Sequence, residues 1–285
     1  MRQRVNPTRA ARHRTTVSKP RERRVENHSV RRPQIIDSMI DALKPLDYVH
    51  AFWEGGAAAH DRVDEWSDID AYLLVDNSRV ADAFVAVEKA LESLSPIKQK
   101  YAVSQNPWPG VSQAFYSLKA ASQYLLIDLA ILTVSSPQKF LEPEIHGKAI
   151  FYFNKTGLTE APRFNKHEFD LKMEERSRIL KERFSMFSNF VQKEINRGNS
   201  LEALEYYRTI VVASLVEALR IKYYPAHYDF RMRYVQYELP SEIVERLGNF
   251  CFVNAKEDLQ KKYLQALKWF NRIMTETGSS MHPKS

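Results

Sequence analysis

Two aspartates separated by one residue, Asp68 and Asp70, are the side chains of this 285-residue sequence whose spacing most clearly suggests chemistry. They lead into the apolar run 71–75, which is typical of a buried strand. Residues i and i+2 of a strand lie on the same face, so both carboxylates point the same way. Their repulsion favours protonation of one unless a cation lies between them. Mg2+, which prefers oxygen ligands and substrate phosphates, fits such a pair.

A third carboxylate, Asp128, stands in the middle of the apolar run 124–132. A lone charge within a buried strand is costly unless it is paired or bound to a metal. Asp128 is therefore the third candidate metal ligand.

Two adjacent glycines, Gly55 and Gly56, follow another apolar run at 48–53, in a chain that has only 8 glycines. Glycine at a strand end lets the backbone turn sharply and lets a ligand approach the amides closely. This predicts a strand, a ligand-binding loop and a short helix, followed by the strand that carries Asp68 and Asp70.

This succession of an apolar strand, Gly-Gly, about a dozen residues, Asp-x-Asp and a later strand with one Asp resembles the DNA polymerase beta-like nucleotidyltransferase superfamily. The segment 64–70 is most similar to the small-molecule branch, which includes aminoglycoside and lincosamide nucleotidyltransferases. The resemblance covers residues 34–150 well and the second half of the chain only loosely. Two departures are Gly56, where many members of this branch have Ser, and His60, where Gly is common.

The resemblance implies a Mg2+-dependent nucleotidyltransferase with two metal ions. It would move a nucleoside monophosphate, with AMP as the first candidate, from a nucleoside triphosphate to a hydroxyl of a small-molecule acceptor such as an aminoglycoside-like compound. Asp68 and Asp70 would bridge the two ions. Asp128 would bind the ion that activates the acceptor hydroxyl, and it is also a candidate to take the proton.

The nucleotide-binding residues are expected to be Gly55 and Gly56, whose loop amides would hold the phosphates. Arg62 is a further candidate for a phosphate contact, with an exposed, ion-pairing arginine as the alternative. His60 is either a nucleotide contact or a plain loop residue. Glu54 is either close to the acceptor or a partly buried carboxylate at the strand end.

Alternative functions are a protein-modifying, antitoxin-like nucleotidyltransferase, a non-catalytic nucleotide-binding module, and a template-independent RNA nucleotidyltransferase. Residues 1–33 contain eleven basic and two acidic residues, whereas the remainder contains 31 and 33. The basic character therefore belongs to the N-terminal tail, and the near-neutral remainder argues against a nucleic-acid enzyme. The tail has few apolar residues and no periodicity, which predicts disorder.

The sequence contains no apolar run long enough to span a membrane and no secretory signal, and its one cysteine excludes an internal disulfide, so we expect a cytoplasmic protein. The predicted fold class is α+β. A polymerase beta-like nucleotidyltransferase domain at 34–150, with a small mixed sheet and helices, would follow the tail at 1–33. A linker at 151–165 would lead to a helical bundle domain at 166–277.

Within these domains, Ser78 is predicted to cap a helix that runs to residue 94. One long helix is expected over 166–196, and Asn199 and Glu202 have the spacing of a capping box. An aromatic and charged segment follows Pro225. It would either line the acceptor or base pocket or pack between the domains, and the second interpretation is favoured.

Overall fold

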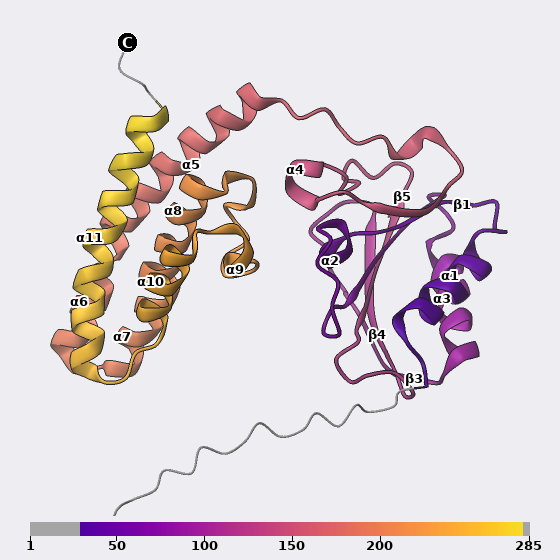
Figure 1. The fold of residues 1–285 in the computed structure, drawn as a ribbon, viewed down its shortest axis with the longest axis horizontal. Helices are drawn as coiled ribbons and strands as arrows, with labels where there is room; N and C mark the ends of the chain where they lie inside the picture. Colours follow the sequence, from indigo (N-terminus) through magenta and orange to yellow (C-terminus); the bar gives the residue numbers. More distant parts are fainter. Residues whose placement is uncertain (1–28, 282–285) are drawn as a thin grey trace, which may run out of the picture.

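The structure, a computed structural model, describes residues 29–281, with side chains placed from 29 to 277. It has two halves that lie side by side: a sheet with its helices, in indigo to magenta, and a group of helices, in salmon to yellow (Figure 1). Almost all of the predicted basic tail lies outside the described residues. The folded part begins slightly earlier than predicted, because Val30 is buried and its N–H donates to the carbonyl of Ala120 at 3.2 Å.

The first half is built on a six-stranded mixed sheet with the strand order β3-β4-β5-β2-β1-β6. Strands β2 and β5 are parallel, and every other neighbouring pair is antiparallel. The bounds are β1 (Val49–Glu54), β2 (Ile69–Val75), β3 (Ile97–Ala102), β4 (Val111–Leu118), β5 (Ile127–Thr133) and β6 (Ile150–Asn154). The predicted α+β class with a small mixed sheet is confirmed.

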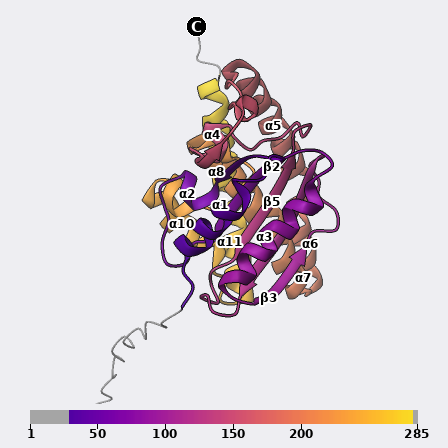
Figure 2. The same ribbon diagram turned by 90° about the vertical axis from the view of Figure 1, so that its right-hand side faces the viewer.

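Two helices, α1 (Arg32–Leu43) and α3 (Val80–Leu94), share one hydrophobic core with one face of this sheet. Figure 2 shows α3 lying across the strands. Ile35 and Met39 of α1 and Leu91 of α3 are fully buried in that core, in keeping with the helical spacing of apolar residues in both helices. Because the helices cover this face, the chemically interesting side chains are confined to the opposite face.

Strand β6 corrects the prediction that residues 151–165 are an irregular linker. It pairs with β1 and forms one edge of the sheet. Phe153 is buried, whereas Ile150 and Phe151 are exposed. The strand was missed because it is short, and because Gly and Pro are dense on both sides of it. The connection to the helical half is therefore shorter than expected and contains the short helix Gly157–Thr159.

Three predicted details of the helices are wrong for local reasons. Helix α3 begins after Arg79, so Ser78 does not cap it. The predicted helix over 166–196 is two helices, α5 and α6, which are separated at residues 188–189. Asn199 makes no capping bond; its Nδ2 instead donates to Glu194 Oε2 at 2.8 Å. For Asn199 the cause is visible, because its side chain binds another partner than the capping pattern suggested.

The helical half packs around its own hydrophobic core. Phe184 stacks on Phe270 with 3.6 Å between ring centroids, and the Tyr207 hydroxyl donates to the carbonyl of Phe250 at 2.8 Å. The helices are α5 (Lys166–Phe187), α6 (Phe190–Arg197), α7 (Ser200–Tyr206), a π-helical turn (Tyr207–Val212), α8 (Ala213–Tyr223), α9 (Val235–Glu238), α10 (Ser241–Cys251) and α11 (Lys256–Met281). Across the described range 29–281, none of the helices has the length and apolarity needed to cross a membrane.

Arg32, at the start of α1, ties this helix to the strand end that precedes the predicted site. It forms an ion pair with Glu54, whose side chain is only 2% exposed. The Tyr152 hydroxyl donates to the same carboxylate at 2.5 Å. Arg32 Nη1 also donates to the backbone carbonyl of Asp68 at 2.6 Å. One buried guanidinium therefore neutralises Glu54 and fixes the backbone at Asp68.

Replacing Arg32 by Met should destabilise the protein strongly, because Glu54 would remain buried without its counter-charge. Loss of one partner of a buried pair typically costs about 3–5 kcal/mol. Urea unfolding at neutral pH measures the change in the free energy of unfolding, with Arg31→Met, an exposed neighbour, as the control. The double variant Arg32→Met/Glu54→Gln should recover part of the loss. Equal stability of Arg32→Met and Arg31→Met would contradict this account of the pair.

Candidate active site

Asp70 and Asp128 lie directly opposite each other, because β2 and β5 pair in parallel with these two residues in register. Their neighbours Ile69 and Leu129 are fully buried in the core under α1 and α3. The alternation of a strand therefore turns both aspartates to the other face, where they line a cleft. The structure brings these two predicted residues together.

Asp68 lies one residue before β2, and it is exposed. Its Oδ1 accepts a hydrogen bond from the backbone N–H of Leu126 at 3.2 Å, at the approach to β5. It is not among the residues that line the cleft. It nevertheless acts on the other two aspartates through its charge, since it raises the pKa of both Asp70 and Asp128.

The pKa values of both cleft aspartates are raised above those of ordinary aspartates. Burial is the main cause for Asp70, and the charge of Asp68 adds to it, against the opposing charge of Arg233. Burial also raises the pKa of Asp128 to about 6, although Gln113 Nε2 donates to its Oδ1 at 2.7 Å. Negative charge concentrated in this way favours a bound cation over two free carboxylates.

Gly56 makes the close approach of the loop to Asp70 possible. It has φ +53°, and a Cβ built on it would lie 1.7 Å from Asp70 Oδ2. The N–H of Gly55 donates to the backbone carbonyl of Asp70 at 3.0 Å, and the N–H of Ala57 donates to its carboxylate. The Gly55–Gly56 loop, in which α2 (Gly56–Ala59) begins, is thus held directly against Asp70.

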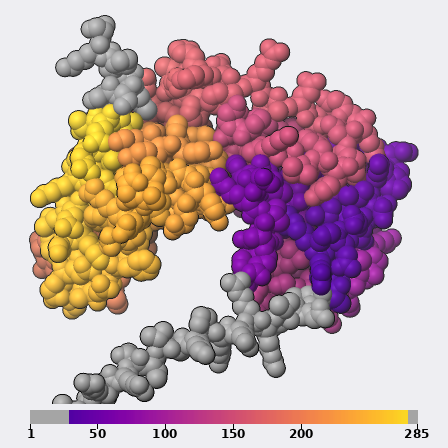
Figure 3. All heavy atoms as spheres, viewed as in Figure 1, coloured from indigo at the N-terminus to yellow at the C-terminus, as the bar shows by residue number. Residues whose placement is uncertain are grey.

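The cleft has a volume of about 450 Å³ and is lined by both halves of the protein. Figure 3 shows the halves meeting where the violet atoms around α2 touch the orange atoms that follow α8. Besides Asp70, Asp128, Gly55 and Gly56, the sheet half contributes His60, Tyr72, Gln113 and His146, among others; the helical half contributes Lys172, Tyr228, Asp229, Phe230, Arg233 and Tyr234, among others.

Arg62 is absent from the residues that line the cleft, in contrast to the other predicted nucleotide-binding residues Gly55 and Gly56. Its Nη1 lies 3.6 Å from Glu238 Oε1, and its guanidinium lies 4.8 Å from the centre of the Tyr237 ring. Arg62 thus packs and forms an ion pair between the halves, with a side chain that is 26% exposed and not the fully exposed arginine of the alternative interpretation. The phosphate contact of Arg62 stays a prediction.

A buried polar cluster holds the two halves against each other. His227 and Arg220 are both fully buried, and both bond to Glu238, at 2.8 Å and 2.7 Å. His227 Nε2 also lies 2.6 Å from the carbonyl of Ile145, in α4 (Pro143–His146) of the sheet half. The segment after Pro225 thus fulfils both interpretations: His227 packs between the halves, whereas Tyr228, Asp229 and Arg233 line the cleft.

Several cleft residues were not recognised from the sequence, and one of them carried a signal. Gln113 is a polar residue within the alternating strand β4, at a position whose neighbours Ser112 and Ala114 face the other way. His60, for which a nucleotide contact was one interpretation, does line the cleft; burial and then the charge of Arg62 lower its pKa. Lys172 lies within the strongly charged helix α5, where one lysine is indistinguishable from its neighbours.

The two cleft aspartates fit a divalent metal, because they are half-buried and paired in register, and because burial and the charge of Asp68 raise the pKa of both. Between residues 29 and 281, no group of three His, Cys, Asp or Glu side chains is placed so that it could hold a metal ion. Asp70 and Asp128 are the pair that the register assembles, while the Leu126 amide holds Asp68. The predicted ligation by three aspartates stays a prediction.

Comparisons with known proteins find similarity in solved structures alone. No family model and no curated protein matches the sequence. An aminoglycoside 6-adenyltransferase from Bacillus subtilis is similar in structure, with 14% identity, 88% of this chain and 92% of that chain covered, and a TM-score of 0.35. A spectinomycin adenyltransferase from Enterococcus faecialis, solved with ATP and spectinomycin, has 10% identity, 88% and 99% coverage, and a TM-score of 0.34.

A nucleotidyltransferase-like protein from Exiguobacterium sibiricum has 12% identity, 87% and 77% coverage, and a TM-score of 0.32. Because all three TM-scores are below 0.5, the functional argument rests on the cleft of this protein.

Replacing Gly56 by Ala should disrupt the loop, because the new Cβ would collide with the Asp70 carboxylate and because φ is positive there. Strain of this kind costs on the order of 1–3 kcal/mol. Thermal melting gives the test. Gly248→Ala is the matched control, since that glycine lies in helix α10 with open space around it and should lose no stability. A Gly56→Ala protein as stable as Gly248→Ala would show that the loop relaxes freely.

Replacing Asp128 by Asn should stabilise the metal-free protein at pH 8. The pKa of Asp128 is about 6 in the folded protein against 3.8 ordinarily, so folding binds protons between these values and stability falls as pH rises through that window. Above pH 6 the full penalty applies, up to about 3 kcal/mol. Below pH 4 the difference should vanish.

The measurement is a pair of melts at pH 8 and pH 4 in a chelator, with Asp41→Asn, an exposed aspartate of α1, as the control. A variant with the same stability as the parent at pH 8 would mean that Asp128 carries no burial penalty.

Proposed function

We propose that this protein is a metal-dependent nucleotidyltransferase. It transfers a nucleoside monophosphate, with AMP as the first candidate, from a nucleoside triphosphate to a hydroxyl of a small molecule. The observation that carries the proposal is the pair Asp70 and Asp128, held side by side in a cleft against a Gly-Gly loop. Two buried carboxylates beside a loop with free approach to its backbone suit phosphate chemistry better than a structural role.

Asp70 and Asp128 would hold the divalent cation, with Asp68 near enough to add its charge, and the cation would neutralise phosphate oxygens. We assign Mg2+ to this position because the ligands are carboxylates. Two ions are the number expected for this chemistry.

The phosphates of the nucleoside triphosphate would be held by the loop and by the positively charged residues of the cleft. The Gly55–Gly56 loop leaves room for close approach to its backbone, and Lys172 and Arg233 supply positive charge from the helical half. Arg233 lies near enough to Asp70 to lower its pKa. A triphosphate between the halves would thus be in contact with both of them, which explains why the site lies at their junction.

The transfer itself requires an acceptor oxygen to attack the α-phosphorus while the bond to pyrophosphate breaks. Asp128 is placed to accept the proton of the acceptor hydroxyl. With a pKa of about 6 it is ionised at neutral pH and is still basic enough to take a proton. The Gln113 hydrogen bond fixes the orientation of its carboxylate.

Replacing Asp70 by Asn should abolish turnover and leave the fold intact. It keeps the shape of the side chain but removes one charge from the cation site, which we expect to cost a thousandfold or more in rate. The assay is pyrophosphate release with each nucleoside triphosphate and Mg2+, with Asp47→Asn, an exposed aspartate, as the control. Melts with and without Mg2+ and nucleotide accompany it.

In these melts the parent should be stabilised by Mg2+ with nucleotide, and the Asp70→Asn variant should not. Full turnover by Asp70→Asn would overturn the catalytic assignment. Stabilisation of the parent by nucleotide without any turnover would indicate a nucleotide-binding module in place of an enzyme.

A further inference from the structure

A second cavity, of about 620 Å³, lies on the sheet next to Asp128. Its floor is formed by β3 and β4, where Tyr101 pairs with Phe115 and Phe115 pairs in turn with Asp128 of β5. Residues paired in this way lie on the same face of a sheet. The cavity is therefore a continuation of the catalytic face toward the edge strand β3.

The order of the strands places this groove opposite the phosphate loop. Going across the sheet, the Gly-Gly loop follows β1, Asp70 lies on β2, Asp128 on β5, Phe115 on β4 and Tyr101 on β3. In nucleotidyl transfer the attacking and leaving oxygens lie on opposite sides of the phosphorus. If the leaving pyrophosphate lies by the glycines, the acceptor must approach from the side of Asp128 that faces β4 and β3.

The volumes of the two cavities also suggest separate places for the nucleotide and the acceptor. The cleft of about 450 Å³ is near the lower end of the range, roughly 300–1,000 Å³, that one drug-sized ligand occupies. A space of this size suits one ligand of that class. The groove of about 620 Å³ provides the space that the second substrate needs.

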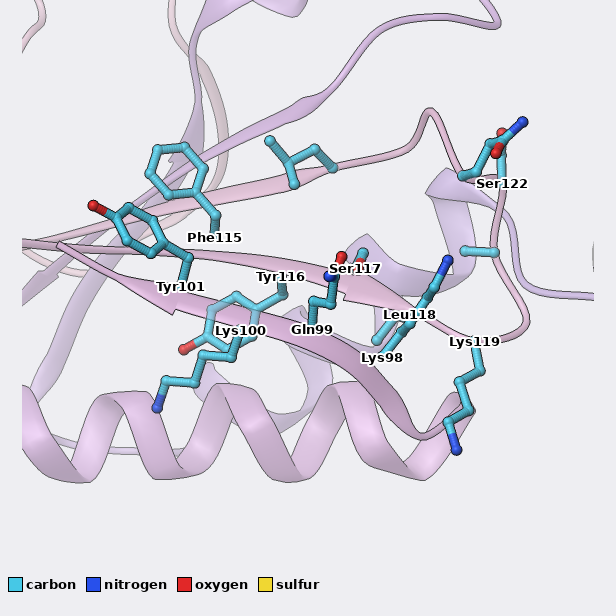
Figure 4. A pocket seen from close by; sticks show the side chains of 13 residues that line it. Lys98, Gln99, Lys100, Tyr101, Phe115, Tyr116, Ser117, Leu118, Lys119 and Ser122 are labelled. Carbon is cyan, nitrogen blue, oxygen red and sulfur yellow. The ribbon is translucent and has the colours of Figure 1, made fainter.

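The walls of the groove indicate the chemistry of that substrate. The rings of Tyr101 and Phe115 are stacked, 26° from parallel with centroids 6.1 Å apart, and Tyr101 is 65% exposed. Figure 4 shows Lys98 extending to the same side of the sheet as these rings, whereas Lys100 and Lys119 extend to the helix side. Lys100 is occupied by Glu88 there, at 2.6 Å. Exposed rings stack on flat groups, and the ammonium group of Lys98 attracts an anion.

The charges around the reacting centre also favour an anionic acceptor. None of the residues that line the groove is acidic. In the cleft, Asp229 is the sole carboxylate besides Asp70 and Asp128, against Lys172 and Arg233. Polycationic acceptors of the aminoglycoside type would meet like charges here and lack the carboxylates that bind amino groups.

We infer that the groove over β3 and β4 is the acceptor subsite, and that the acceptor is a hydroxylated molecule with a flat ring and an anionic group. The ring lies on Tyr101 and Phe115, the anion lies at Lys98, and a hydroxyl reaches Asp128. This assignment rests on the proposed function, because it uses the direction of attack on a nucleotide.

A matched series of aryl sugars tests this assignment: 4-nitrophenyl glucuronide, which is anionic, 4-nitrophenyl glucoside, which is neutral, and the corresponding 2-amino sugar, which is cationic. Equilibrium dialysis with the full chain, Mg2+ and a non-hydrolysable nucleoside triphosphate measures binding, and pyrophosphate release with the natural triphosphates measures transfer. The glucuronide should bind most tightly and the amino sugar least.

The variants Lys98→Gln and Tyr101→Ala should each weaken glucuronide binding about five- to tenfold. Both side chains are exposed, so the fold should tolerate these changes. Lys89→Gln is the matched control, because Lys89 is an exposed lysine of α3 that does not line the groove, and it should have no effect. Binding of the glucoside should respond to Tyr101→Ala but not to Lys98→Gln.

Tighter binding of the amino sugar than of the glucuronide, or equal losses in Lys98→Gln and Lys89→Gln, would overturn the subsite. Absence of glucuronide binding would also overturn it. The proposed function fails separately, when Mg2+ with nucleotide neither stabilises the parent protein nor supports pyrophosphate release. A nucleotide response that Asp70→Asn abolishes, with no effect of the groove variants, would thus reject this inference and leave the proposed function standing.

Discussion

The parallel pairing of β2 with β5 is the constraint on which the rest of the site depends. It sets Asp70 opposite Asp128 in a sheet whose other neighbouring pairs are antiparallel. Both carboxylates are thereby held close together in a partly buried place, where burial raises the pKa of each and the charge of Asp70 further raises the pKa of Asp128. The protein retains this unfavourable arrangement, and arrangements of this kind are characteristic of functional sites, where local stability is sacrificed for binding or catalysis.

The surrounding structure supports that pair from three directions. Gly56 provides the space that the Asp70 carboxylate needs, Gln113 orients Asp128, and Arg32 fixes the backbone at Asp68. Each support comes from a different element, because Gly56 begins α2, Gln113 lies in β4 and Arg32 lies in α1. The helical half then closes one side of the cleft through the buried contacts of His227 and Glu238. The site is consequently a property of the whole fold and not of one motif.

Sequence reasoning reached the parts of this structure that local patterns determine. Asp70, Asp128 and the two glycines, which were selected by type and spacing, lie together in the cleft. It failed where distant partners decide. Arg62 contacts Glu238, far away in the sequence. Asn199 is a different case, since its partner Glu194 lies only five residues earlier in the chain. Strand β6 exists because β1 offers it an edge, and no property of residues 150–154 alone reveals that edge.

Strand β3 has a further consequence, which concerns solubility. It is one of the two free edges of the sheet, and nearly all of its residues are exposed. An open edge is a template for pairing with another chain, and natural proteins block such edges with lysines and bulges. Here Lys98 and Lys100 stand on the strand, and its register with β4 shifts between Ile97 and Gln99. A sheet edge that must stay open to small molecules is thereby closed to other copies of the same sheet.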